Sequence, residues 1–220
     1  MAAACNVGTS RGTARLIRLA LILQLPIVPT QDARAADFTV TTTMDCLGCG
    51  SLRDAIIGAN AATPIAGGHT INFAVSGTTT LSYMLPPIFA SLSINGPGTG
   101  NLTISGANSQ RVFFIGDGSN AVNVAIKNLS VTNARAQGGN ASVAGGGGLG
   151  AGGALFVNSS ASVMVHNVAF VNNVAAGGAG GSGGTGNSGG GGGGMGGNAG
   201  LGFAAGGGGL ASNVVLDPMI

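Results

Sequence analysis

The side chains that could carry out acid–base chemistry are few and scattered along this chain. Glutamate is absent, and between Asn60 and Val214 the only carboxylate is Asp117, which lies in a Gly-Asp-Gly-Ser-Asn turn. An inverting glycoside hydrolase needs two carboxyl groups ~6.5–9.5 Å apart, and calcium-assisted lyase chemistry needs clustered carboxylates for the metal. One aspartate supplies neither arrangement. The sequence therefore predicts no catalytic residue, no metal site and no cofactor.

The remaining charged residues point away from catalysis as well. His69 and His166 have no carboxylate partner in their segments, so we expect loop or surface histidines rather than general bases. Arg53 is expected on the polar face of a helix rather than in a site. Charged residues make up 6% of the chain, against ~25% in a typical soluble domain. That low charge excludes a basic groove for nucleic acid, so we expect no nucleic-acid partner.

Cys46 and Cys49 form a Cys-x-x-Cys pair that is compatible with three kinds of site. A redox pair is expected at a helix start in a βαβ context, which the surrounding sequence lacks. A metal site would need two more ligands, and His69 is the only candidate nearby. A structural disulfide suits an oxidising compartment, and it is the interpretation that we favour.

Residues 1–35 have the features of a secretory signal peptide. Arg11, Arg15 and Arg18 precede or enter an apolar run from Leu16 to Val28, and Ala33-Arg34-Ala35 supplies a small-x-small cleavage site. The run is shorter than the ~20 residues that span a membrane, so we expect no transmembrane segment after its removal. Without residues 1–35, four basic side chains face five aspartates, a net charge of −1. We therefore expect an exported protein, secreted or at the cell surface.

A short amphipathic helix is predicted at residues 51–60. Ser51 can cap its N-terminus, and Asp54, three residues later, completes an acidic variant of the capping box. A strand from Phe38 to Thr43 precedes it, because these residues alternate and are rich in β-branched side chains. Four apolar residues share one face of the helix: Leu52, Ala55, Ile56 and Ala59.

From Thr70 onward every apolar run is short and is separated from the next by turn residues, which favours a coil of stacked turns. One repeat supports stacking, since residues 126–133 align with residues 165–172 at a shift of 39. A match at a fixed period is typical of a solenoid, in which each coil pairs with its neighbours. The aligned asparagines are expected to stack from coil to coil: Asn128 on Asn167, and Asn133 on Asn172.

The stretch from Phe38 to Asn60, centred on Cys-Gly-Ser-Leu-Arg-Asp-Ala-Ile, resembles the CSLREA-type N-terminal segment of exported bacterial right-handed β-helix proteins, some of them called polymorphic outer-membrane or autotransporter-like proteins. Residues 93–98, 102–106 and 163–173 resemble the coils that follow it. The chain departs from that pattern by an extra glycine, Gly50, and by Asp54 where glutamate is usual. The resemblance implies an all-β, right-handed parallel β-helix of the pectin-lyase-like kind, whose helix shields its edge strands.

Glycine supplies 44 of 220 residues, against ~7% in ordinary proteins, and it concentrates late in the chain. A flexible insertion and a bundle of polyproline-like strands packed through bare backbone are the two interpretations. We favour the flexible insertion, because ordering each residue costs ~1–2 kcal/mol. The expected organisation is signal peptide (1–35), strand and capping helix (36–62), coils (63–176), glycine-rich tract (177–209) and the start of a further coil (210–220).

These features together predict an exported, non-catalytic scaffold. We expect a surface-exposed, adhesin-like or passenger domain, as the N-terminal fragment of a longer protein. Its partner would be cell-surface carbohydrate or protein bound along the coil faces. Two alternatives are a pectin-lyase-like carbohydrate-active enzyme, which needs carboxylates that this chain lacks, and a non-functional truncation.

Overall fold

The computed structural model describes residues 34–142, 144–182, 192–195 and 198, all within the unit Ala33–Ile220. Most of the predicted signal peptide, part of the glycine-rich tract and the predicted further coil at 210–220 lie outside the described residues. The described elements are β1 (Asp37–Val40), α1 (Leu52–Ala61), β2 (His69–Phe73), β3 (Gly77–Thr80), β4 (Leu92–Asn95), β5 (Leu102–Ser105), β6 (Phe113–Ile115), β7 (Val122–Thr132), β8 (Arg135–Gln137), β9 (Leu155–Val157), β10 (Ala161–Val171) and β11 (Val174–Ala176).

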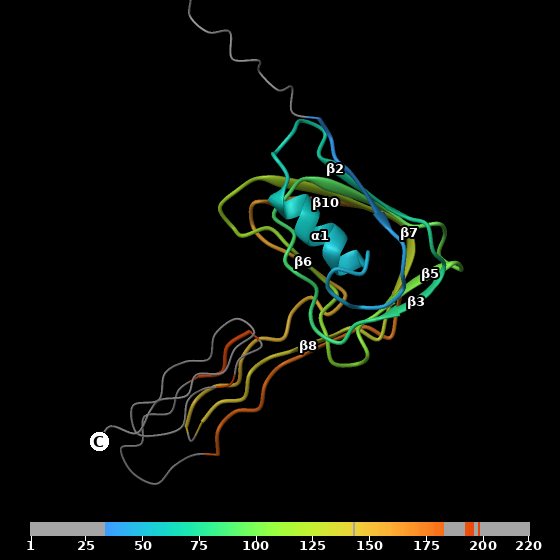
Figure 1. Ribbon diagram of the computed structural model, residues 1–220. Coiled ribbons are helices and arrows are strands. Elements are labelled where there is room, and N and C mark those ends of the chain that lie inside the picture. Colours follow the sequence, from blue (N-terminus) through green and yellow to red (C-terminus); the bar gives the residue numbers. More distant parts are fainter. Residues whose placement is uncertain (1–33, 143, 183–191, 196–197, 199–220) are drawn as a thin grey trace, which may run out of the picture. The chain divides into compact units, whose positions relative to one another are not determined.

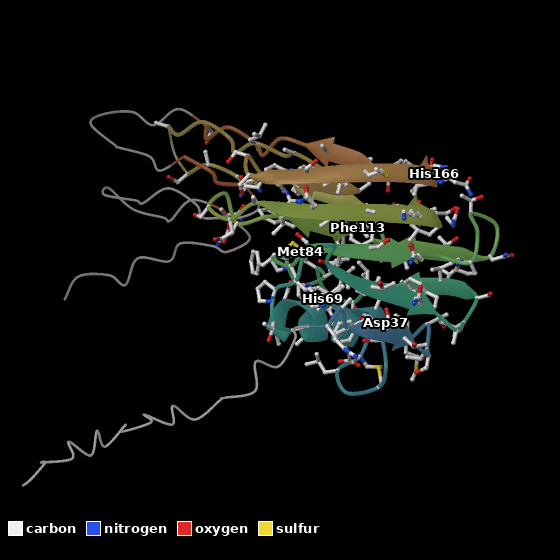
Figure 2. All side chains as sticks on the ribbon, turned by 90° about the horizontal axis from the view of Figure 1, so that it is seen from above. Asp37, His69, Met84, Phe113 and His166 are labelled. Carbon is white, nitrogen blue, oxygen red and sulfur yellow. A yellow bond between two sulfur atoms is a disulfide. The ribbon has the colours of Figure 1, made fainter. Side chains whose placement is uncertain are left out.

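Every pairing between these strands is parallel. In the main sheet the strands β1, β2, β4, β7 and β10 are paired in that order. The second half of β7 also pairs with β5, which in turn pairs with β3. Two smaller sheets join β6 to β9 and β8 to β11. Figure 2 shows the strands of the main sheet in layers, from β1, marked by Asp37, to β10, marked by His166. The predicted all-β class, with parallel strands and little helix, is confirmed.

The repeat found in the sequence sets the register of the last two layers. Val165 pairs with Ile126 and Phe170 with Val131, which is the predicted shift of 39. Two of the short apolar runs of the sequence, residues 122–126 and 129–131, belong to one strand, β7. The bend between them is a single residue, Asn128, at a φ of 55°. A one-residue left-handed bend turns the chain without ending the pairing, because asparagine tolerates this conformation.

The core lies between the curled main sheet, the short strands and α1 (Figure 1). The helix forms where the capping residues and the apolar spacing predicted it, one residue later at each end. It buries Leu52, Ala55, Ile56 and Ala59 and contacts β1 and β2. Full burial of one leucine or isoleucine stabilises a fold by about 1.5–3 kcal/mol. The helix is therefore held mainly by the sheet that it covers.

The glycine-rich segments are bonded to one another through their backbones. Gly138 N–H donates to Ala176 O at 2.8 Å, Gly178 N–H to Gly148 O at 2.9 Å, and Gly193 N–H to Gly146 O at 2.9 Å. Figure 1 shows the yellow and orange segments side by side. For the described residues 177–182 and 192–195, the flexible insertion that we favoured is the wrong interpretation. Amides that find carbonyls on a neighbouring segment offset the entropy that flexibility would keep.

Candidate functional site

The segment before α1 is closed by a disulfide and a capping box. Cys46 and Cys49 are joined by a disulfide bond. Ser51 Oγ donates to Cys46 O at 2.6 Å and accepts from Asp54 N–H at 3.2 Å. The hydroxyl of Ser51 therefore ties the disulfide loop to the first turn of the helix, which is a structural role for all four side chains.

The carboxylate of Asp54 accepts hydrogen bonds from the backbone amides of four consecutive residues, 48–51. Its Oδ1 accepts from Gly48 N–H at 2.8 Å, and its Oδ2 accepts from Cys49, Gly50 and Ser51 at 2.9, 2.9 and 3.2 Å. These bonds, the one from Gly48 first, lower the pKa of Asp54. The extra glycine of this chain, Gly50, has a φ of 79°, so it shapes the turn that aims the amides. A carboxylate used in this way is a structural anion.

Arg53 extends from the polar face of the helix and forms a salt bridge with Asp45. Its Nε and Nη2 donate to the two carboxylate oxygens at 2.8 and 2.9 Å, and Nη1 and Nη2 also reach the carbonyls of Met84 and Tyr83 at 2.9 and 2.8 Å. Burial raises the pKa of Asp45, but bonds from Arg53 and from Ser82 N–H outweigh it, and the net shift is downward. The pair clamps the disulfide loop to residues 82–84.

His69 was expected in a loop or at the surface, and that expectation is wrong. It opens β2 and is 2% exposed. Its Nδ1 accepts from Ala36 N–H at 3.2 Å, which places the proton of the neutral ring on Nε2. Within the described part of the chain, that buried Nε2 has no hydrogen-bond partner. His166, in contrast, is exposed on β10, as expected.

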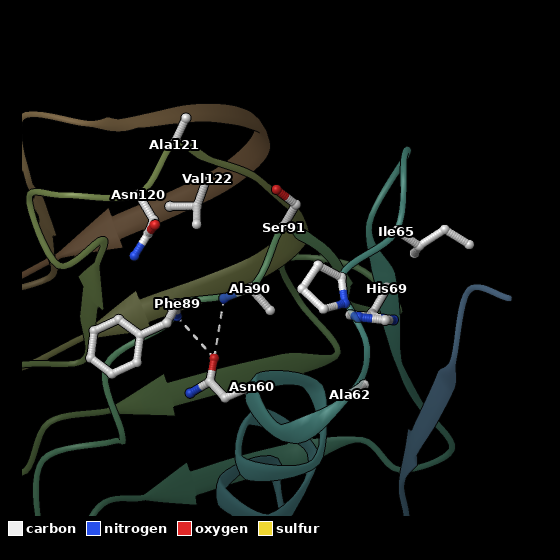
Figure 3. A pocket seen from close by; sticks show the side chains of 11 residues that line it. Asn60, Ala62, Ile65, His69, Phe89, Ala90, Ser91, Asn120, Ala121 and Val122 are labelled. Atoms are coloured by element: carbon white, nitrogen blue, oxygen red, sulfur yellow. Dashed lines mark hydrogen bonds between the residues drawn. The ribbon is translucent and has the colours of Figure 1, made fainter. Parts of the chain in front are cut away.

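A pocket of about 440 Å³ lies beside His69, and Figure 3 shows its walls. Asn60, at the end of α1, lies in it, but its amide is already bonded: Oδ1 accepts from Phe89 and Ala90 N–H at 2.9 and 3.2 Å, and Nδ2 donates to Pro87 O at 2.7 Å. Phe89 is half exposed at the same pocket. Polar and apolar side chains both line the pocket. Among the described residues that line it, His69 carries a buried polar side-chain atom, Nε2, without a hydrogen-bond partner.

Arg111 is a buried cation that sequence reasoning missed. It is 6% exposed, and its Nε and Nη2 donate to Gly152 O and Ala151 O at 3.0 and 2.8 Å. Its guanidinium lies 5.7 and 5.5 Å from the ring centroids of Phe114 and Phe156, which stack on each other at 4.9 Å. Burial lowers the pKa of Arg111. The side chain fastens the turn before β9 onto β6.

The predicted asparagine stack forms at one of its two positions. Asn167 Nδ2 donates to Asn128 Oδ1 at 2.9 Å, and both residues have a positive φ, 50° and 55°. Asn133 and Asn172 occupy equivalent bends, at 49° and 54°. There the contact between layers is made by Asn173, whose Oδ1 accepts from Ala134 N–H at 2.9 Å and whose Nδ2 donates to Val131 O at 2.9 Å.

Asn72 and Asn95 form a hydrogen-bonded pair between neighbouring layers that the sequence analysis did not predict. Asn95 Nδ2 donates to Asn72 Oδ1 at 3.2 Å across the pair β2–β4. The pairing of Asn72 with Asn95 could have been predicted only by aligning two four-residue strands. A match that short cannot be told from coincidence. The pairs Asn72–Asn95 and Asn128–Asn167 show that amide side chains link neighbouring layers at more than one level.

Within the described ranges, no group of three or more His, Cys, Asp or Glu side chains could hold a metal ion. Among the described helices, none is long and apolar enough to cross a membrane. Asp117 accepts from Ser119 and Asn120 N–H at 2.7 and 2.8 Å, and these bonds, the one from Asn120 first, lower the pKa of Asp117 to about 2. It holds its own turn, as a residue in such a sequence commonly does.

Comparison of the chain with protein-family models, with curated proteins and with solved structures finds no match.

Proposed function

We propose that this chain forms an exported bacterial right-handed parallel β-helix that acts as a non-catalytic scaffold, adhesin-like or as a passenger domain at the cell surface. The observation that carries the proposal is the register of the main sheet. Leu92 pairs with His69 in the layer before it and with Val124 in the layer after it, and Val163 pairs with Val124 in turn. Equivalent side chains thus recur from layer to layer, which supports the proposal of a solenoid.

The use of the charged side chains supports a scaffold rather than an enzyme. Asp45 and Arg53 clamp a loop, Asp54 holds four amides, and Arg111 holds a turn. Each of these charged groups is hydrogen-bonded to the backbone or to a partner side chain of the scaffold. A catalytic acid or base needs a free position facing a substrate, and these bonds leave none at those four residues.

The outer face of the layers is the surface that a partner would contact. A shallow hollow of about 340 Å³ crosses β4, β7 and β10, lined by Ser93, Asn123, Lys127, Ser162 and Met164 among others. It crosses successive layers rather than following one strand, so an extended molecule would lie across the coils. Cell-surface carbohydrate or protein is the partner class that we propose for this face.

Export and catalysis are tested on the same preparations. The full chain and a chain without residues 1–35 are expressed in a bacterium, the cell fractions are separated, and the exported protein is assayed on polyuronates. We expect the full chain outside the cytoplasm, the shortened chain inside it, and no release of unsaturated products. Equal cytoplasmic retention of both chains would overturn export, and lyase activity that copurifies with the protein would overturn the non-catalytic assignment.

A further inference from the structure

We propose that Ala36 is the first residue of the mature protein and that its α-amino group binds to His69 Nδ1. The inference rests on the export proposed above. It makes His69 the receptor for an amino terminus that proteolytic processing creates.

Of the described residues, Ala36 is the first whose backbone bonds to the main sheet. Its N–H donates to His69 Nδ1 at 3.2 Å, and its carbonyl accepts from Thr70 N–H at 3.0 Å. The ladder of β1 and β2 then runs from the pair Asp37–Thr70 onward. Arg34 and Ala35 are exposed, whereas Ala36 is half-buried. The boundary of the folded layer therefore coincides with the Ala-Arg-Ala sequence that fits a signal-peptidase site.

The cleavage step is a hydrolysis of the Ala35–Ala36 peptide bond by a signal peptidase. One water is consumed, a carboxylate is left on Ala35 of the released segment, and the proton that this carboxyl group gives up converts the new primary amine of Ala36 into an ammonium. The new amine keeps a hydrogen for His69 Nδ1. Its other hydrogens can face water, because Ala36 is only half-buried.

His69 is held in place to accept that hydrogen. The residue begins β2, its N–H donates to Ser91 O at 2.9 Å, and the residue as a whole is 2% exposed. The Phe38 ring forms a T-shaped pair with it, with centroids 6.3 Å apart and planes at 79°. A neutral imidazole with its proton on Nε2 offers an acceptor at Nδ1 alone. An ammonium suits this acceptor, and β1, the terminal strand of the main sheet, gains an anchor at its start.

The processed chain has a composition that makes the test simple. It contains two kinds of amine only, the α-amine of Ala36 and the single lysine, Lys127. The full chain is expressed, the exported protein is purified, and its first residue is identified by intact mass and N-terminal sequencing. The folded protein is then treated with a limiting amine acylating reagent, and the label at each amine is measured against urea-unfolded protein.

We expect the exported chain to begin at Ala36. Relative to Lys127, its α-amine should react about two- to tenfold more slowly in the folded protein than in the unfolded one, the range that one hydrogen bond supplies. His69→Phe should remove this protection, and the matched variant His166→Phe should leave it unchanged. His69→Asn carries an amide oxygen near the position of Nδ1 and should restore it, which keeps the test valid where His69→Phe does not fold.

The possible failures are separate. A mature chain that begins elsewhere would overturn the processing site. A chain that begins at Ala36 with an unprotected amine, or with protection that His69→Phe leaves intact, would overturn the role of His69. Retention in the cytoplasm would overturn export itself. The role of His69 is then judged on protein from which a cleavable tag has been removed to leave Ala36.

Discussion

Two neighbouring glycines, Gly178 and Gly177, should respond in opposite ways to alanine. A Cβ at Gly178 would lie against the Gly139 carbonyl, closer than van der Waals contact, whereas a Cβ at Gly177 would meet only Gly148 O at 3.6 Å. Both changes reduce the freedom of the unfolded chain, which stabilises by about 0.4–1 kcal/mol where the backbone permits it. Only Gly178→Ala adds overpacking, at about 1–3 kcal/mol. The two variants should therefore differ by about 1–3 kcal/mol.

Amide hydrogen exchange measures this difference where it arises. The reporter amides are those of Gly138 and Gly181, which donate to Ala176 O and Gly145 O at 2.8 and 2.9 Å. At these amides, Gly178→Ala should exchange about 5- to 150-fold faster than Gly177→Ala. Gly181→Ala and Gly180→Ala form a second pair, since a Cβ at Gly181 would meet Ser142 O and one at Gly180 has Gly145 O at 3.9 Å. Equal and fast exchange in both members of each pair would refute the packed bundle.

Three further substitutions test the cap and the layers. Asp54→Asn should destabilise the protein by about 1.5–3 kcal/mol. Since the pKa of Asp54 is lowered below its ordinary 3.8, this stabilisation is present above that value and is lost as the pH falls through the folded pKa. The difference in melting temperature between the two proteins should therefore narrow as the pH is lowered from 6 to 2. Asn167→Ala should cost about 1–2 kcal/mol of backbone strain beyond its lost bond to Asn128, whereas Asn167→Gly should lose the bond alone; equal costs in urea unfolding would contradict the bend. Arg53→Ala should cost about 3–5 kcal/mol, because Asp45, with its side chain 2% exposed, loses its cation; a loss below 1 kcal/mol would show that the pair is solvated.

Features that depend on local sequence could be predicted. The helix at 52–61 was expected at 51–60, because its capping residues and its apolar face lie within a few positions of one another. The register of β10 on β7 followed from a repeat of eight residues, whose pattern survives in both copies. In both cases the information sits inside a short window.

Features that depend on distant contacts could not be predicted. His69 meets Ala36 from 33 positions away, and Arg111 meets Gly152 from 41 positions away. Neither segment contains a sign of its partner, because partner choice follows from the register of whole layers. A histidine without a local carboxylate was therefore assigned to the surface, although the fold encloses it.

The glycine tract shows a signal that composition conceals. Residues 177–185 form the triplets Gly-Gly-Ala, Gly-Gly-Ser and Gly-Gly-Thr. A period of three is that of a polyproline II helix, and among the described residues it is the second glycine of each triplet, Gly178 and Gly181, that is half-buried, whereas Gly177 and Gly180 are exposed. The content of glycine suggested flexibility, while its spacing matches packing.

In this fold the burial of a side chain depends on its layer in the sheet more than on the type of residue. Val165 and Phe170 of β10 are 42% and 46% exposed, although they occupy the register positions of Ile126 and Val131, which are 1% and 0% exposed one layer earlier. The side chains point the same way, and what differs is the presence of a described layer above them. At the other end of the stack α1 supplies that cover. The burial of a side chain in the main sheet therefore depends on the layers on either side of it, and a substitution on β10 tests whether anything packs against that strand.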